Sequence, residues 1–303
     1  MSDKKIFLTG GSGFLGWNIC HHFINNNIPL YALKHSTPLL NHDLIREVRA
    51  DLLEQDSIES LIQNLQPDVI VHCAALSGTG QCENNPQLAE KLNVDVTGNL
   101  LKAANPDHCR FIYISTDLVF DGSKGWYKES DETNPGMVYA RTKVKSENIV
   151  RSMSPNYVIA RMALMYGLPS PSYSSFLEWM KDGFKEGSLN LFRDEYRTPL
   201  YVKDAAKGLY DLCFSDYTGL LHLGGPERCS RYDFGLLFAR IAGMPEDAIH
   251  GEYLADANTE VYRPPDVSLD SSLATDLIDF IPCGIEEGIA DYIKYENATT
   301  RER

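Results

Sequence analysis

A glycine-rich turn near the amino terminus restricts the fold of this chain more than any other stretch. A short apolar run over residues 6–8 leads into Thr9–Gly16, where three of the glycines have the spacing G-x-x-G-x-x-G. Residues 17–24 follow with apolar side chains at helical spacing. Strand, glycine turn and helix in this order predict a dinucleotide site, because free N–H groups at the positive end of the helix attract a diphosphate. An ordinary strand-to-helix turn is the alternative, and the expected cofactor contacts are Gly10, Ser12, Gly13, Phe14, Leu15 and Gly16.

Strands and helices alternate after this turn. Nearly continuous apolar runs predict strands over residues 29–33, 48–53, 67–75, 110–117 and 159–162. Helical spacing begins at residue 56 and continues over 86–104 and 138–150. The pattern predicts an α/β fold, a Rossmann-type, doubly wound parallel sheet whose ligands bind at the carboxyl ends of the strands.

Composition limits the class of ligand. The chain has 303 residues and a net charge of −14, which argues against binding to nucleic acid or to an anionic membrane. No apolar run reaches the length of a membrane span, and Ser2–Lys5 are typical neither of a signal peptide nor of a transit peptide. The seven cysteines are scattered, without C-x-x-C pairs, so we expect reduced thiols, no zinc site and a cytoplasmic protein.

Three later segments bear on the cofactor. Lys34 and His35 follow the second strand, where NAD-binding folds usually carry an acid. Because these side chains can pair with a 2′-phosphate, NADP(H) is preferred and NAD(H) remains the alternative, as does a merely solvated lysine. Asp51, with Leu52, is placed to accept a hydrogen bond from adenine or to begin a helix. The small Ala74 and Ala75 leave room for a ligand backbone.

A candidate catalytic group lies further along the chain. Tyr139 and Lys143 are four residues apart and share one face of a helix. A nearby ammonium is expected to lower the pKa of the phenol and make Tyr139 a general acid for a carbonyl oxygen. Thr116, at the end of a strand, can bind the same oxygen. Asn93 lies within the helix predicted over 86–104, where it can hold a bend and a proton-relay water.

The chain resembles the extended short-chain dehydrogenase/reductases, and within them the dTDP-4-dehydrorhamnose reductase group. The matching segments are residues 115–122 (STDLVFDG), 193–199 (RDEYRTP), 221–225 (LHLGG) and 263–270 (RPPDVSLD). The resemblance implies a catalytic trio with Asn93 as the fourth member, and Arg263 as a contact of the substrate diphosphate. The implied catalytic residues are Thr116, Tyr139, Lys143 and Asn93, and the implied substrate contacts are Thr116, Asp117, Arg197 and Arg263.

The implied activity is NADPH-dependent reduction of a 4-keto, nucleotide-activated deoxysugar, with hydride to the ketone carbon and a proton from Tyr139. A 4,6-dehydratase would need an Asp-Glu pair, but Asp117 is followed by Leu118. A nucleotide-sugar epimerase is disfavoured by the missing acid after the second strand. A non-catalytic, NADP-binding regulatory subunit, a class that this group also contains, remains the second hypothesis.

One position departs from the group. Characterised reductases of this group carry an acidic residue in the first helix that helps to bind magnesium at a dimer contact, and the matching residue here is Asn18. We therefore predict no metal and leave a homodimer open. The expected Rossmann domain covers residues 1–163, with 200–225 returning to it. Residues 164–199 and 226–303 are expected to form a smaller, mainly helical part that binds the nucleotide sugar.

Overall fold

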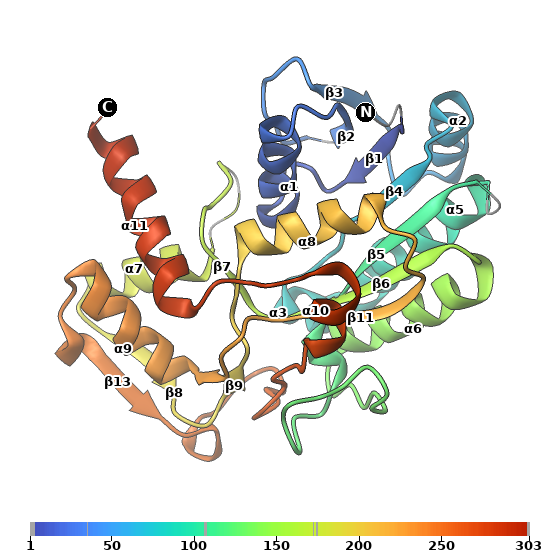
Figure 1. Cartoon of the computed structure of the whole chain (residues 1–303). Coiled ribbons are helices and arrows are strands. Elements are labelled where there is room, and N and C mark those ends of the chain that lie inside the picture. Colours follow the sequence, from blue (N-terminus) through green and yellow to red (C-terminus); the bar gives the residue numbers. More distant parts are fainter. Residues whose placement is uncertain (1–3, 35, 106–107, 172, 174, 302–303) are drawn as a thin grey trace.

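The structure, a computed structural model, describes residues 4–34, 36–105, 108–171, 173 and 175–301. A seven-stranded, all-parallel sheet with helices on both faces forms its centre (Figure 1). The strand order reverses between β1 and β4, as in a doubly wound fold, so the predicted fold class is confirmed. Across the sheet the strands are β11 (Gly219–Leu223), β6 (Tyr157–Met162), β5 (Arg110–Thr116), β4 (Val69–His72), β1 (Ile6–Thr9), β2 (Leu30–Lys34) and β3 (Ile45–Arg49).

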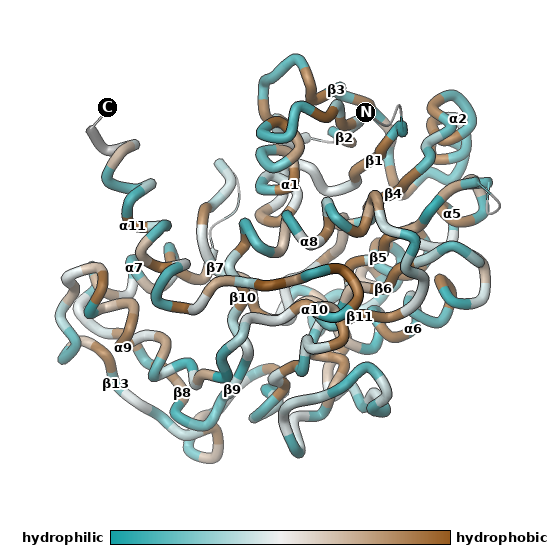
Figure 2. Tube along the Cα trace, in the orientation of Figure 1, coloured by the Kyte–Doolittle hydropathy of each residue, from teal (hydrophilic) through white to brown (hydrophobic). Residues whose placement is uncertain are grey.

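Alternate side chains of the strands build a hydrophobic core on each face of the sheet. Leu8 packs in the core that includes α1 (Phe14–Asn25) and α8 (Val202–Phe214). The neighbouring Phe7 packs in the opposite core, with the helices α2 (Gln55–Leu65), α5 (Val96–Ala103) and α6 (Val138–Met153). Because both faces are covered, the central strands are apolar along their length, as the brown segments of Figure 2 show.

Two predicted elements differ in the structure. The strand expected over 48–53 is β3, which ends at Arg49. The chain turns there because the Asp51 carboxylate accepts a hydrogen bond from the Leu53 N–H at 2.9 Å. The helix expected over 86–104 is divided into α4 (Pro86–Glu90), a π-helical segment (Lys91–Asp95) and α5.

Segments that follow β6 build a smaller, mainly helical part with its own core, seen with its long last helix at the left of Figure 1. Its helices are α7 (Phe176–Glu186), α9 (Arg231–Ala242) and α11 (Ile285–Arg301). Short strand pairs lie near these helices in the sequence. They are β7 (Met165–Tyr166) with β10 (Leu200–Tyr201), β8 (Leu189–Phe192) with β13 (Ile249–Glu252), and β9 (Tyr196–Arg197) with β12 (Cys229–Ser230). Elsewhere among the described residues of the whole chain, the short helices are α3 (Thr79–Asn84), α10 (Ser272–Ile278) and the 3₁₀ turns Asp117–Val119, Glu246–Ala248 and Leu254–Asp256.

The chain passes between the two parts more than once. β11 pairs with β6 in the main sheet, and α8 covers the same face as α1. Ala274 and Phe280, from the last third, also pack in that core. The domain boundaries at residues 163, 200 and 225 stay a prediction. Within the described residues, every helix is too short or too polar to cross a bilayer.

Candidate active site

One cavity of about 870 Å³ lies at the carboxyl ends of the central strands, where the strand order reverses. The segments after β1, β2, β3, β4, β5 and β6 line it, together with α6 and residues of the smaller part. Lys34, Asn93 and Arg263 do not line it, and His35 lies outside the described residues. The predicted residues that it brings together are Gly10, Ser12, Gly13, Phe14, Leu15, Gly16, Asp51, Leu52, Ala74, Ala75, Thr116, Asp117, Tyr139, Lys143 and Arg197.

The glycine turn makes a backbone cradle at the start of α1. Gly10 has a φ of +71°, and a Cβ there would lie 2.8 Å from the backbone nitrogen of Ala74. A Cβ on Gly16 would lie 2.1 Å from the carbonyl oxygen of Gly10, so only glycine lets α1 come this close to the turn. The helix has no side-chain cap at Gly13 and no acidic residue in its first turn. Its first N–H groups can therefore bind an anion, and the cradle fits a dinucleotide diphosphate.

Gly16→Ala is expected to weaken NADPH binding by about tenfold or more, because the methyl group forces α1 away from Gly10. Gly98→Ala in α5 is the matched control, since nothing lies within 4 Å of its added Cβ. Fluorescence titration with NADPH measures both affinities. Equal affinities of the wild type and Gly16→Ala would contradict the assignment of the cradle.

The chemical groups lie where α6 meets the end of β5. Tyr139 and Lys143 line the cavity beside Thr116. Burial lowers the pKa of Lys143 to about 8, and its Nζ lies 4.4 Å from the ring centroid of Tyr113. The expected lowering of the Tyr139 pKa is wrong: burial and the nearby Asp117 carboxylate raise it above 10. Tyr139 is therefore protonated at neutral pH, which is the state that a proton donor needs.

Asn93 lies outside the cavity, in the π-helical segment, and is buried. Its side-chain amide accepts from the Leu76 N–H at 2.8 Å and donates to the Leu76 carbonyl at 3.1 Å and to Thr142 Oγ1 at 2.9 Å. Its own carbonyl accepts from the hydroxyls of Thr97 and Ser146, each at 2.7 Å. The single hydroxyl proton of Ser146 also has the Thr142 carbonyl within reach, at 2.9 Å, so the relay water at Asn93 stays a prediction. A π-helical segment interrupts the helix at Asn93, and the Asn93 side chain holds the loop after β4 against α6.

A buried hydrogen-bond chain that we did not predict joins β1 to the same segment. Thr97 gives its proton to Asn93, so it accepts from His72 Nε2 at 3.2 Å. His72 Nδ1 then accepts from the Thr9 hydroxyl at 2.7 Å. Burial and the charge of Lys143 lower the His72 pKa to about 3, which keeps the ring neutral in this tautomer. The chain fixes the strand end that carries the glycine turn.

Three arginines converge on one buried carboxylate, that of Glu195. Its oxygens lie 2.9 Å from Arg197 Nη2, 2.8 Å from Arg263 Nη2 and 3.4 Å from Arg231 Nε. Arg197 and Arg231 line the cavity, whereas the Arg263 side chain is 39% exposed outside it. We missed Arg231, although it is the first residue of α9, where the helix dipole disfavours a positive charge. Glu195 and the nearby Asp117, 3.9 Å from Arg197 Nε, carry two negative charges against three guanidinium groups, so this end of the cavity keeps a net positive charge that attracts an anion.

At the end of the cavity next to β2 and β3, the predicted cofactor contact Lys34 pairs with another side chain instead of lining the cavity. Lys34 Nζ lies 3.0 Å from Glu47 on the adjacent β3. Ser36 and Thr37, in the segment after β2, line the cavity instead, together with Asp51. Pairing of β2 with β3 brings Glu47 beside Lys34, a contact that local sequence spacing does not reveal.

Asn18, where the resemblance implies a metal-binding acid, faces the interior. It is 4% exposed and donates to the carbonyls of Phe14 and Leu168, each at 2.9 Å. It therefore ties α1 to the segment before α7. Among the described residues, no group of three His, Cys, Asp or Glu side chains is arranged to hold a metal. All seven cysteines are free thiols.

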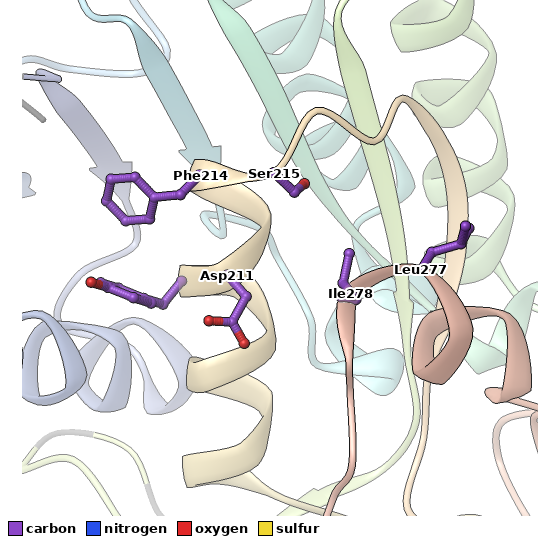
Figure 3. Close-up of a pocket in the computed structure, with 6 residues that line it drawn as sticks. Asp211, Phe214, Ser215, Leu277 and Ile278 are labelled. Carbon is purple, nitrogen blue, oxygen red and sulfur yellow. The ribbon is translucent and has the colours of Figure 1, made fainter.

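A second hollow of about 400 Å³ lies between α8 and α10 (Figure 3). Arg110, the first residue of β5, donates to Ser215 on its wall at 3.1 Å, which places this hollow at the amino ends of the strands. Its walls are mainly apolar and bring no set of catalytic groups together: Tyr210, Asp211, Phe214, Ser215, Leu277 and Ile278.

Comparisons with known proteins agree with this geometry. Two curated relatives cover most of the chain. The methionine adenosyltransferase 2 subunit beta of Bos taurus is 30% identical over 280 residues, 89% of this chain and 81% of that protein. A probable low-salt glycan biosynthesis reductase of Haloferax volcanii is 27% identical over 270 residues, 88% of this chain and 89% of that protein.

Solved structures show the same fold over nearly the whole chain. A dTDP-4-dehydrorhamnose reductase of Clostridium acetobutylicum has a TM-score of 0.84 at 26% identity, covering 97% of this chain and 99% of that one. A dTDP-4-dehydrorhamnose reductase of Bacillus anthracis in complex with NADP has a TM-score of 0.83 at 22% identity, covering 97% and 100%. The model of the family described as RmlD substrate binding domain matches residues 4–297. The chain therefore belongs to the RmlD substrate binding domain family, among the extended short-chain dehydrogenase/reductases.

Proposed function

We propose that this protein is an NADPH-dependent reductase of a 4-keto, nucleotide-activated deoxysugar, most simply dTDP-4-dehydro-L-rhamnose. The observation that carries the proposal is a single cavity that joins a diphosphate cradle, a protonated tyrosine and an arginine cluster. The cradle suits the cofactor, and the arginines suit the diphosphate of a sugar nucleotide. The reductase names of a curated relative and of a solved structure support the same activity.

In the proposed reaction, one residue of the cavity transfers the proton and the others position the cofactor and the substrate. When bound, NADPH supplies the hydride for the ketone carbon. Tyr139 gives a proton to the ketone oxygen, and Thr116 holds that oxygen by a hydrogen bond. Lys143 binds the nicotinamide ribose, and Asn93 keeps α6 in register with the loop after β4. Arg197 and Arg263 attract the substrate diphosphate.

The preference for NADPH rests on the segment after β2. Lys34 brings a positive charge to this edge, and Ser36 and Thr37 add hydroxyl groups that line the cavity. His35, outside the described residues, is proposed as a second partner of the 2′-phosphate. Glu47 neutralises part of the charge of Lys34, so we expect a moderate preference rather than exclusion of NADH.

NADPH consumption at 340 nm tests the proposal, with the ketosugar made in situ by a dTDP-glucose dehydratase and a 3,5-epimerase, and NADH alongside. We expect faster oxidation of NADPH, and a preference over NADH that falls by about tenfold in Lys34→Ala. Lys207→Ala, which removes only a surface pair with Asp211, is the control. Binding of NADPH without oxidation of it by any ketosugar would contradict the reductase.

The second candidate is an NADP-binding regulatory subunit. The 30% identity to methionine adenosyltransferase 2 subunit beta, over 89% of this chain, favours it. Under this alternative the dinucleotide binds, no ketosugar is reduced, and the effect of the chain appears only in a partner enzyme.

A further inference from the structure

Unpaired polar atoms inside a folded protein point to missing partners. Two of those in this structure, Asp117 Oδ2 and Arg231 Nη1, belong to residues that line the large cavity. One of them accepts hydrogen bonds and the other donates them. The six buried side-chain atoms without a hydrogen-bond partner among the described residues are Tyr113 OH, Asp117 Oδ2, Ser154 Oγ, Arg161 Nη1, His222 Nε2 and Arg231 Nη1.

Asp117 directly follows Thr116, so it lies beside the proposed position of the reacting carbonyl. Asp117 is 4% exposed, and its Oδ1 accepts a hydrogen bond from the Thr116 hydroxyl at 3.1 Å. Its Oδ2 lies 3.9 Å from Arg197 Nε, which is too far for a hydrogen bond. Burial raises the pKa of this carboxyl group, although the charge of Arg197 and the hydrogen bond from Thr116 lower it in part.

The guanidinium group of Arg231 is fixed in place, but its Nη1 has no hydrogen-bond acceptor. Its Nε faces Glu195 at 3.4 Å, and its guanidinium lies over the Phe176 ring, 4.5 Å from the centroid. These contacts fix the plane of the group and leave Nη1 buried without an acceptor. Glu195 also pairs with Arg197 and Arg263, so its carboxylate does not accept hydrogen bonds from all the nitrogens of Arg231.

We propose that Asp117 and Arg231 together bind the 3-hydroxyl of the ketosugar, on the ring carbon next to the ketone. A hydroxyl group donates to the carboxylate and accepts from the guanidinium at once. A phosphate would satisfy Arg231 but be repelled by Asp117, and an ammonium would be repelled by Arg231. In a 4-ketosugar, C3 is the neighbour of the ketone that carries a hydroxyl, since C5 carries the ring oxygen and C6. The inference rests on the proposed function and narrows its substrates to ketosugars that keep this hydroxyl.

Binding of the reduced sugar nucleotide tests the inference without turnover. In the presence of NADP⁺, calorimetry compares dTDP-L-rhamnose with its 3-deoxy counterpart. We expect the wild type to bind the hydroxylated ligand about 10- to 100-fold more tightly, because the deoxy ligand leaves both protein groups unpaired. Asp117→Asn and Arg231→Gln should each reduce this ratio to about threefold or less, mainly by weakening the hydroxylated ligand.

Arg228→Gln is the matched control, because it removes an arginine paired with Asp266 that does not line the cavity. It should keep the wild-type ratio, and unchanged NADP⁺ affinity shows that each variant is folded. Equal affinities of the wild type for the two ligands, or binding of neither, would overturn the inference. Failure of the reductase is a separate result: selective binding without NADPH oxidation rejects the activity and leaves the hydroxyl site standing.

Discussion

Tyr139→Phe is expected to lower kcat for ketosugar reduction by about 10²–10⁴-fold and to leave the Kd for NADPH unchanged. The substitution removes one oxygen from a side chain that lines the cavity and keeps the ring that packs there. The structure supports a proton donor at this position because the phenol remains protonated at neutral pH. Stopped-flow oxidation of NADPH at saturating ketosugar measures the loss, and fluorescence titration measures the Kd.

The same variant separates the two candidate functions. A reductase loses turnover and keeps the cofactor, whereas a regulatory subunit has no turnover to lose and its effect on a partner enzyme persists. Turnover that survives in Tyr139→Phe within about threefold of the wild type would place the proton donor elsewhere.

Glu147→Gln is expected to lower the free energy of unfolding by about 3–5 kcal/mol, because it leaves the charge of Arg161 buried without a counterion. Glu147 accepts from Arg161 Nε at 2.9 Å, from Arg161 Nη2 at 2.8 Å and from Ser115 Oγ at 2.6 Å. Both charged side chains are buried. Urea denaturation measures the change.

Lys145→Ala provides the comparison for this pair. The Lys145–Glu90 pair is 2.7 Å long but exposed, so its loss should change stability by about 0.5 kcal/mol or less. A loss below about 1 kcal/mol in Glu147→Gln would show that the buried pair does not stabilise α6 against β5 and β6.

The contribution of Glu147 also has a defined pH dependence. Burial raises its pKa, but the ion pair with Arg161 outweighs this and holds the pKa below the ordinary value of 4.5. A carboxyl group with a lowered folded pKa stabilises above the unfolded pKa and loses that effect as the pH falls through the folded pKa. The difference between the wild type and Glu147→Gln should therefore be constant near neutral pH and shrink below about pH 4.5.

This pair matters for the site as well as for stability. Ser115, which hydrogen-bonds to Glu147, lines the cavity next to Thr116. Glu147 lies one turn beyond Lys143 on α6. The buried carboxylate therefore sets the distance between the end of β5, proposed to hold the carbonyl, and α6, proposed to deliver the proton.

The parts of the site that could be predicted are those encoded by local spacing. Once the strand and helix are assigned, the spacing of the glycines predicts the turn at the start of the helix. In the same way, the four-residue spacing of Tyr139 and Lys143 predicts that both side chains lie on one face of a helix. Parallel strands then bring their carboxyl ends to one edge, which places Thr116 and Ala74 in the same cavity.

The parts that could not be predicted depend on contacts between distant segments. Arg231 reaches the cavity because β12 pairs with β9, and nothing near it in the sequence indicates a ligand. Glu47 comes beside Lys34 only through strand pairing. The Tyr139 pKa rises because of burial, a property of the whole fold, whereas the helical spacing indicated only the lysine.

Transfer of deuterium from NADPH labelled at nicotinamide C4 to the sugar is the most direct test of the proposed reductase. The enzyme is incubated with the ketosugar and cofactor labelled on either face, and the product is analysed by mass spectrometry. We expect a dTDP-6-deoxyhexose one mass unit heavier, with the label at C4, from one of the two cofactor isomers. An unlabelled product from both isomers, or no product while NADPH binds, would contradict hydride transfer to a ketosugar.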